Sequence, residues 1–156
     1  MNKKVIDALN KARSRELTAI LQYMAQHFEL EDADYGKLAK VIKKIAIVEM
    51  KHAEKLAERI LFLGGTPTSK PDAEAKKGQT IQQMLATDIA LEIEAVKLYN
   101  ESALLCAAEK DQISKEVFES LLAEEEDHEN DFENIQDHIE KLGESYLATL
   151  AGGAAE

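Results

Sequence analysis

Two short motifs in this sequence combine residue types that can bind a metal ion. Glu49 and His52 form the first Glu-x-x-His motif. Glu125 and His128 form the second, so the two motifs use half of the four histidines in the chain. Both lie in long segments with helical periodicity, where a spacing of three places the two side chains next to each other on one face. The sequence therefore predicts two paired ligand groups, one on each of two helices.

The helix faces that carry the two motifs are otherwise apolar. Around the motifs, the residues at helical spacing are Leu38, Ile42, Ile45, Leu56, Ile60 and Leu63 on one segment, and Phe118, Leu121, Phe132, Ile135, Ile139 and Leu142 on the other. Apolar faces of this kind point into a core. One Glu-x-x-His motif alone is more often a surface pair in an acidic helix, but two copies on apolar faces favour a buried metal site.

Two further glutamates, Glu16 and Glu92, interrupt predicted inward faces in the same way. A shift of 76 residues relates Glu16 to Glu92, and the same shift relates each residue of the first motif to its counterpart in the second. This internal repeat predicts a bundle of approximate two-fold symmetry, in which four carboxylates and two imidazoles meet at one centre.

The four glutamates would bring four negative charges into an apolar core, which cannot hold them unpaired. The predicted inward faces contain no Lys or Arg, so we expect no basic partner there. Two divalent cations would balance the charge, with His52 and His128 each giving one nitrogen. Oxygen-rich sites with one imidazole per ion favour iron or manganese over structural zinc, and dinuclear carboxylate bundles use this ligand set. We expect no catalytic residue beyond the metal ligands.

Three polar residues near the predicted ligands leave two interpretations each. Tyr23 and Tyr99 lie seven residues after Glu16 and Glu92, and either fill the core or donate hydrogen bonds to the carboxylates. Asp88, one turn before Glu92, either orients a ligand histidine or is partly solvated. His27 is expected in the core or in an interface rather than among the ligands.

Long periodic segments and scarce glycine and proline predict an all-α fold. Both prolines lie in residues 64–79, which indicate a long crossover, and a four-helix bundle with this connection runs its second and third helices parallel. Asp32 or Asp34 is expected to cap the second helix, and Thr80 the third. We expect one domain over residues 1–156, with the bundle at about 4–142 and a short C-terminal fifth helix at about 144–151.

The composition excludes several partners. The formal net charge is −11 and no basic stripe is present, which argues against binding to nucleic acid or to an anionic membrane. Cys106 is the only cysteine, so no disulfide can form within the chain, as is usual in a reducing compartment. Neither a signal peptide nor a membrane span is expected. The predicted location is the cytoplasm.

The sequence resembles the ferritin-like proteins, and more narrowly the bacterioferritins, over nearly its whole length. The most specific segments are RELTAILQY around Glu16, IVEMKHAEKLAERILFLGG around Glu49, ATDIALEIEAV around Glu92 and EEEDHEN around Glu125. The methionine in EMKHAE separates bacterioferritins from ordinary ferritins. The chain has no tryptophan, unlike many bacterioferritins, and it lacks the cysteine pairs of a rubrerythrin.

The resemblance implies a shell of 24 subunits built from dimers, which stores ferric mineral and oxidises Fe(II) at a di-iron centre in each subunit. It implies that Glu49 and Glu125 are bridging ligands and that Glu16 and Glu92 are terminal ones, with His52 and His128 giving the nitrogens. It further implies haem between two subunits, one haem per two subunits, bound by Met50 from each side.

Helix geometry is compatible with the expectation for Met50, which points about 100° away from the metal face because it directly follows Glu49. Ala46, Ala53 and Ala57 share its side of the helix and would leave a shallow slot. Spacing alone favours a methionine that packs between subunits. The resemblance favours a haem ligand.

We therefore expect an iron-storage protein and ferroxidase that uses dioxygen or hydrogen peroxide as its oxidant. A small electron-transfer protein is left open as the partner that releases iron. Two alternatives remain: a di-iron redox enzyme, such as a peroxidase, that forms no shell, and a module that binds haem or iron with little turnover.

Overall fold

The computed structural model describes residues 1–153, so residues 154–156, the end of the expected domain range, lie outside the described part. Residues 1–153 contain five helices and no strand, which confirms the predicted all-α fold with a short fifth helix. The helices are α1 (Lys3–Asp32), α2 (Gly36–Phe62), α3 (Ile81–Ala108), α4 (Gln112–Leu142) and α5 (Glu144–Thr149). The fifth helix ends two residues before the expected position.

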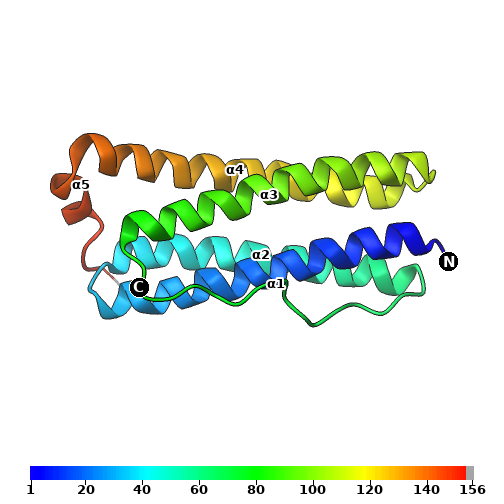
Figure 1. Ribbon diagram of the computed structural model, residues 1–156, viewed down its shortest axis with the longest axis horizontal. Coiled ribbons are helices and arrows are strands. Elements are labelled where there is room, and N and C mark those ends of the chain that lie inside the picture. Colours follow the sequence, from blue (N-terminus) through cyan, green and yellow to red (C-terminus); the bar gives the residue numbers. More distant parts are fainter. Residues whose placement is uncertain (154–156) are drawn as a thin grey trace.

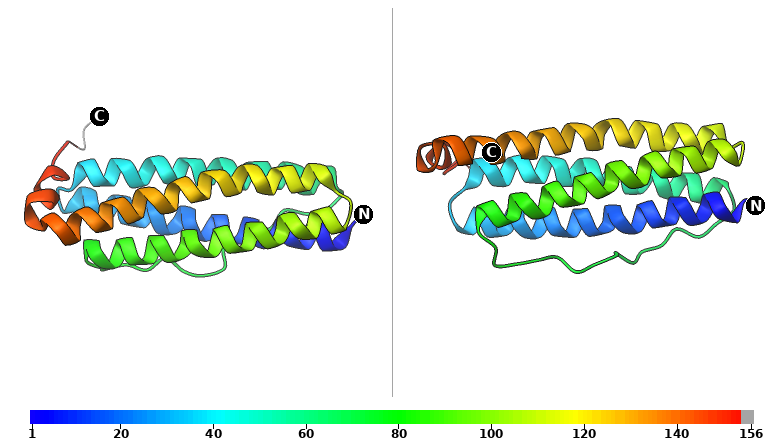
Figure 2. Two further views of the ribbon diagram at one scale, coloured as in Figure 1. Left: turned by 90° about the horizontal axis from the view of Figure 1, so that it is seen from above. Right: turned by 45° about the horizontal axis from the view of Figure 1, so that its top comes forward.

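The four long helices form one bundle with a long crossover between α2 and α3 (Figure 1). α1 packs mainly against α2, and α3 against α4. The crossover returns along the outside of α1 to the end of the bundle where α2 begins, so α3 runs parallel to α2 (Figure 2). α5 lies at that same end.

A row of polar side chains on α1 binds the crossover. Asn10, Ser14, Thr18 and Gln22 are spaced by four, so they lie along one ridge of the helix. All four exchange hydrogen bonds with backbone groups of residues 66–76. These side chains supply hydrogen bonds to backbone groups of the crossover, which forms no helix or sheet that could satisfy them.

Of the two predicted caps, that of α3 is confirmed and that of α2 is not. The side chain of Thr80 caps α3, with Gln83 completing a capping box, and Asp111 caps α4 by accepting from the backbone N–H of Ser114. Gly143 ends α4 with φ 58°, a conformation that favours glycine. The expected cap of α2 was wrong: Tyr35 holds that position without a side-chain hydrogen bond, while Asp34 adopts φ 63° in the turn.

The apolar core is divided into two clusters. One contains Leu9, Leu56, Tyr99 and Phe118 at the end of the bundle where the chain begins. The other contains Tyr23, Ile42, Leu85 and Phe132 at the end near α5. Each large buried side chain contributes roughly 1.5–3 kcal/mol, so the two clusters hold the helices in register on either side of a polar layer. None of the described helices has the length and apolar character needed to cross a bilayer.

Candidate metal centre

The polar layer between the two clusters contains all six predicted metal ligands. Glu16 comes from α1 and Glu92 from α3, while α2 supplies the first Glu-x-x-His motif and α4 the second. The four glutamates are fully buried, and the two histidines are 3% and 6% exposed. The structure thus brings together the side chains that the sequence placed on four inward faces.

The six side chains form two groups that share two members. Glu16, Glu49, His52 and Glu125 form one group, in which one ligand atom of each residue lies within 4.8 Å of those of the others. The second group meets the same limit and contains Glu49, Glu92, Glu125 and His128. Glu49 and Glu125 belong to both groups, which is the arrangement that two bridging carboxylates and two terminal ones would have.

Each histidine lies closest to the glutamate of the opposite motif. The distance from His128 Nδ1 to Glu49 Oε1 is 2.8 Å, and that from His52 Nδ1 to Glu125 Oε1 is 3.1 Å. The two imidazole rings are stacked, with 6.2 Å between their centroids. Both Nδ1 atoms therefore lie among the carboxylates.

Several buried atoms of these residues make no hydrogen bond of good geometry. They include one oxygen of each glutamate and the Nδ1 atom of each histidine. Buried polar atoms in native proteins normally have partners. A metal ion would satisfy carboxylate oxygens and imidazole nitrogens together, and hard carboxylate oxygens with one imidazole per ion suit iron or manganese. The residues present therefore fit two such ions.

Burial and mutual repulsion govern the protonation of the site. Burial raises the pKa values of Glu49 and Glu92, and neighbouring carboxylates raise them further. Burial also opposes ionisation of Glu125, but the close imidazoles of His128 and His52 and the charge of Arg15 hold its pKa well below the usual value. Burial disfavours a charged His52, yet its contacts with Glu125 and Glu16 raise its pKa to about 10. The site thus holds protons that metal ions would displace.

Arg15 contradicts the expectation that no basic side chain lies among the glutamates. It is 4% exposed, and its Nη1 atom lies 3.2 Å from Glu125 Oε2 and 3.3 Å from Glu49 Oε2. Arg15 is off the inward face of α1, but its long side chain reaches around the helix into the site. The four carboxylates and this guanidinium have a formal charge of −3, rather than the −4 expected from the sequence.

The two tyrosines fill the core and also bind the carboxylates. Tyr23 donates a hydrogen bond to Glu92, and Tyr99 donates one to Glu16. Burial raises the pKa values of both hydroxyls, and the charge of the bound glutamate raises them further, so the tyrosines remain neutral donors. Both interpretations of these residues hold together.

The outcome for Asp88 differs from both expectations. Asp88 is fully buried rather than partly solvated, and it accepts a hydrogen bond of 2.7 Å from Gln26 on α1 rather than from a histidine. Burial raises its pKa to about 8, although the Gln26 amide lowers it. His27 is buried as expected, with its Nδ1 atom 2.8 Å from the Ala39 carbonyl oxygen. Gln26 is a polar core residue that sequence reasoning missed.

Met50 lies outside the metal layer, as its position after Glu49 predicts. Its side chain is 52% exposed on the face that α2 forms with α1. Met50 lines a surface pocket of about 350 Å³, together with Arg13, Leu17, Ile20, Ala53, Glu54 and Ala57. Ala53 and Ala57 thus form part of the expected slot, whereas Ala46 is buried in the core. Met50 belongs to neither of the two ligand groups.

Comparisons with known proteins agree with this architecture. Residues 6–142 match the family model described as Ferritin-like domain. The bacterioferritin of Desulfovibrio desulfuricans is 44% identical over 149 residues, which cover 96% of this chain and 83% of that protein. The bacterioferritin of Brucella melitensis is 37% identical, with 98% of this chain and 95% of that protein covered.

Two solved structures have the same fold. The D. desulfuricans bacterioferritin, whose di-iron site was determined in different catalytic states, superposes with a TM-score of 0.95 at 43% identity, covering 98% of this chain and 90% of that one. Mycobacterium tuberculosis bacterioferritin, BfrA, gives 0.93 at 29% identity, with 97% and 96% covered. On the family match and these relatives, the chain belongs to the ferritin-like family and, within it, to the bacterioferritins.

Proposed function

We propose that this protein is a ferroxidase that oxidises Fe(II) at a di-iron centre and stores the product as ferric mineral. The observation that carries this proposal is the pair of overlapping ligand groups, in which Glu49 and Glu125 are common to both. In this assignment Glu49 and Glu125 bridge two ions, Glu16 and His52 complete one, and Glu92 and His128 complete the other. The similarity to the D. desulfuricans bacterioferritin, which has a di-iron site, supports a di-iron centre here.

The protein supplies a buried, preformed set of ligands. Two Fe(II) ions would give one electron each to dioxygen or hydrogen peroxide. Tyr23 and Tyr99 orient the terminal glutamates, since each hydroxyl donates to one carboxylate oxygen. The flanking apolar clusters keep water out of the layer, which strengthens the attraction between carboxylates and cations. His52 and the protonated glutamates release their protons as the ions bind.

Stopped-flow oxidation tests this function. Fe(II) added to the metal-free protein in air is expected to show a fast phase that saturates at two ions per subunit. Glu49→Ala should abolish the fast phase, because both ligand groups lose a member. Glu126→Ala is the matched control, since Glu126 is exposed on the outer face of α4 and should leave the phase unchanged. A fast phase at the wild-type rate in Glu49→Ala would contradict the proposal.

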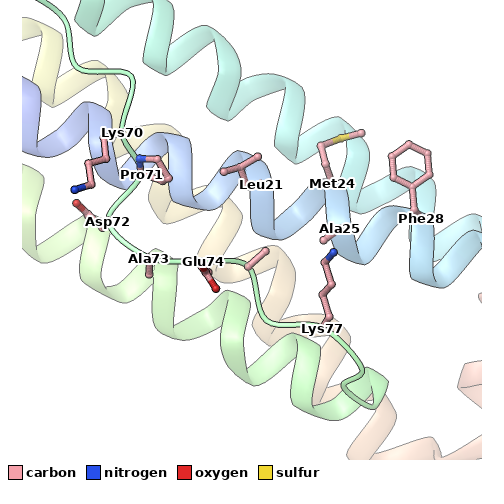
Figure 3. Close-up of a pocket in the computed structure, with 11 residues that line it drawn as sticks. Leu21, Met24, Ala25, Phe28, Lys70, Pro71, Asp72, Ala73, Glu74 and Lys77 are labelled. Atoms are coloured by element: carbon pink, nitrogen blue, oxygen red, sulfur yellow. The ribbon is translucent and has the colours of Figure 1, made fainter.

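We further propose that the subunits form dimers and that these build a hollow shell of 24 subunits. The surface of α1 supports a contact with a second copy: Leu21 is 50% exposed and Phe28 60% exposed. With Met24 and Pro71 they line a groove of about 730 Å³ between α1 and the crossover (Figure 3). Exposed apolar surface of this kind is typical of a protein interface. Light scattering should give the mass of a shell.

Haem is the second proposed cofactor, one per two subunits, with Met50 as its axial ligand from each subunit. The support is the pocket around the half-exposed Met50, which lies beside the same face of α1 and is open to a partner. A thioether can ligate haem iron. Arg13, which lines the pocket, offers a positive charge for a haem propionate.

Two alternatives differ from this proposal in measurable ways. A peroxidase-like di-iron enzyme without a shell would have the mass of a monomer or small oligomer and would retain no mineral. A module that binds haem or iron with little turnover would lack the fast oxidation phase.

We propose the cytoplasm as the compartment, where the buried thiol of Cys106 would remain reduced. We also propose that residues 1–156 form a single domain.

A further inference from the structure

Arg15 holds the oxygen atoms that bridging ligands would need. Its Nη1 atom donates hydrogen bonds to Oε2 of both Glu49 and Glu125, the two carboxylates common to the ligand groups. The same nitrogen lies 3.5 Å from Glu16 Oε1, and Nη2 lies 3.9 Å from Glu92 Oε1. A bridging carboxylate gives one oxygen to each ion. With the guanidinium in this position, one oxygen of each shared carboxylate is already engaged.

The charges of the site also oppose a guanidinium beside two metal ions. The four carboxylates and Arg15 together carry a formal charge of −3, so two divalent ions would change it to +1 with Arg15 still in place. Without Arg15 the same ions would make the site neutral. Since charges interact strongly where water is excluded, the ions would repel the guanidinium at the distances at which it now binds the glutamates.

The structure provides a place for the displaced side chain. Arg15 also lines a surface pocket of about 290 Å³ between α1, α3 and the crossover. Three acidic residues, Asp72, Glu94 and Glu101, line this pocket, together with Lys11 and Lys97. Within residues 1–153, the Nε atom of Arg15 has no hydrogen-bond partner. Besides the glutamates, the one group there that binds the guanidinium is the Leu91 carbonyl oxygen, 2.7 Å from Nη2. A rotation of the side chain would carry its charge from the metal layer to the pocket.

We propose that Arg15 is a built-in counter-ion of the metal centre, which neutralises part of its charge in the metal-free protein and withdraws to the acidic pocket when divalent ions bind. This role rests on the proposed di-iron function. Arg15 would thereby stabilise the empty site and set its affinity for metal. It is a positioning residue, because it acts on the glutamates rather than on the iron.

The internal repeat indicates that the fold itself does not require this arginine. The shift of 76 residues that relates Glu16 to Glu92 relates Arg15 to Leu91. The two positions meet where Arg15 Nη2 donates to the Leu91 carbonyl. A leucine therefore already occupies the equivalent place in the other half of the bundle, so Arg15→Leu should fold.

The test measures Co²⁺ binding and thermal unfolding of the metal-free protein, because Co²⁺ occupies such sites without being oxidised by air. Arg15→Leu should tighten Co²⁺ binding on the order of tenfold, as the ions no longer compete with a close charge. The same variant should lower the Tm of the metal-free protein. Unchanged or weaker binding would overturn the proposal. Arg59→Leu is the matched control: it breaks an ion pair with Asp111 far from the site, so it should lower Tm without changing Co²⁺ affinity.

A second pair of variants tests the pocket. Asp72→Asn with Glu101→Gln should weaken Co²⁺ binding by about two- to fivefold when Arg15 is present and have no effect in Arg15→Leu. An equal effect in both backgrounds would show that the pocket does not receive the side chain. If Arg15→Leu does not fold, Arg15→Gln removes the charge and keeps a donor, with the same expected tightening. If the wild type binds no Co²⁺ at two per subunit, the proposed metal centre itself is wrong.

Discussion

Tyr23 on α1 donates a hydrogen bond to Glu92 on α3, so a side chain of the first helix pair holds a carboxylate of the second. The internal repeat produces the reciprocal bond, in which Tyr99 on α3 binds Glu16 on α1. Each tyrosine also packs against an aromatic ring of α4, Tyr23 against Phe132 and Tyr99 against Phe118. The two apolar clusters thus fix the hydroxyls that orient the terminal glutamates.

The first prediction follows from this cross-connection. Tyr23→Phe keeps the ring in its packing but leaves Glu92 without its donor. Co²⁺ binding should weaken by about 10–100-fold, the usual effect of removing a partner of a metal ligand. Tyr146→Phe is the control, because Tyr146 lies in α5 at the end of the bundle. Equal Co²⁺ affinity in the wild type and in Tyr23→Phe would show that the bond does not orient Glu92.

The second prediction concerns Glu49 and Glu125, which are both fully buried but have pKa values shifted in opposite directions. In the metal-free protein, burial and the neighbouring carboxylates raise the pKa of Glu49 above its unfolded value, so ionised Glu49 destabilises the folded state. Glu49→Gln should therefore raise Tm. Glu125 is ionised in both states, and its lowered pKa contributes stability that is present above its unfolded pKa and is lost as pH falls through the folded one. Glu125→Gln should lower Tm, with a loss of roughly 2 kcal/mol, since Arg15 loses a partner.

Thermal unfolding of the two metal-free variants at pH 7 provides the measurement. A shift of the same sign in both would contradict the opposite directions of these two pKa shifts.

The third prediction concerns pH. Asp88 has a folded pKa of about 8, against about 3.9 for an unfolded aspartate. Between these values it is neutral when folded and ionised when unfolded, so it lowers stability increasingly as pH rises. Asp88→Asn should become more stable than the wild type by up to about 1.4 kcal/mol per pH unit across this window. Urea unfolding of the metal-free proteins at pH 5, 6 and 7 measures the difference, and parallel pH profiles would contradict it.

The fourth prediction concerns haem. Met50→Leu conserves volume and removes the sulfur, so it should eliminate haem binding while leaving assembly and Co²⁺ binding unchanged. Met84→Leu, a change in the core of the bundle, is the control and should retain haem. The absorption spectrum after addition of hemin measures the effect. One haem per two subunits with an unaltered spectrum in Met50→Leu would exclude Met50 as the ligand.

The sequence predicted the helices and the six inward residues because both depend on local periodicity. Thr80 and the Glu-x-x-His motifs act within one helix, so their positions follow from spacing. The 76-residue repeat supplied the one long-range relation, since it implied that the halves meet around a common centre.

Contacts between helices were harder to predict. Helical spacing predicted that Tyr23 lies near the carboxylates, but it could not show which glutamate the hydroxyl binds. The spacing placed Asp88 one turn before Glu92, but it could not show that its partner would be Gln26 of another helix. Arg15 was missed because helical periodicity gives the direction of the first side-chain atoms, and a long guanidinium can reach a neighbouring face. The 76-residue repeat relates Arg15 to Leu91. An apolar residue at the equivalent position indicates that position 15 lies between helices.

Anomalous X-ray scattering from crystals soaked with Fe(II) without oxygen would locate the bound ions. We expect two iron peaks per subunit, with Glu49 and Glu125 touching both, His52 and Glu16 touching one, and His128 and Glu92 touching the other. A single peak, or iron bound only outside this layer, would contradict the di-iron assignment.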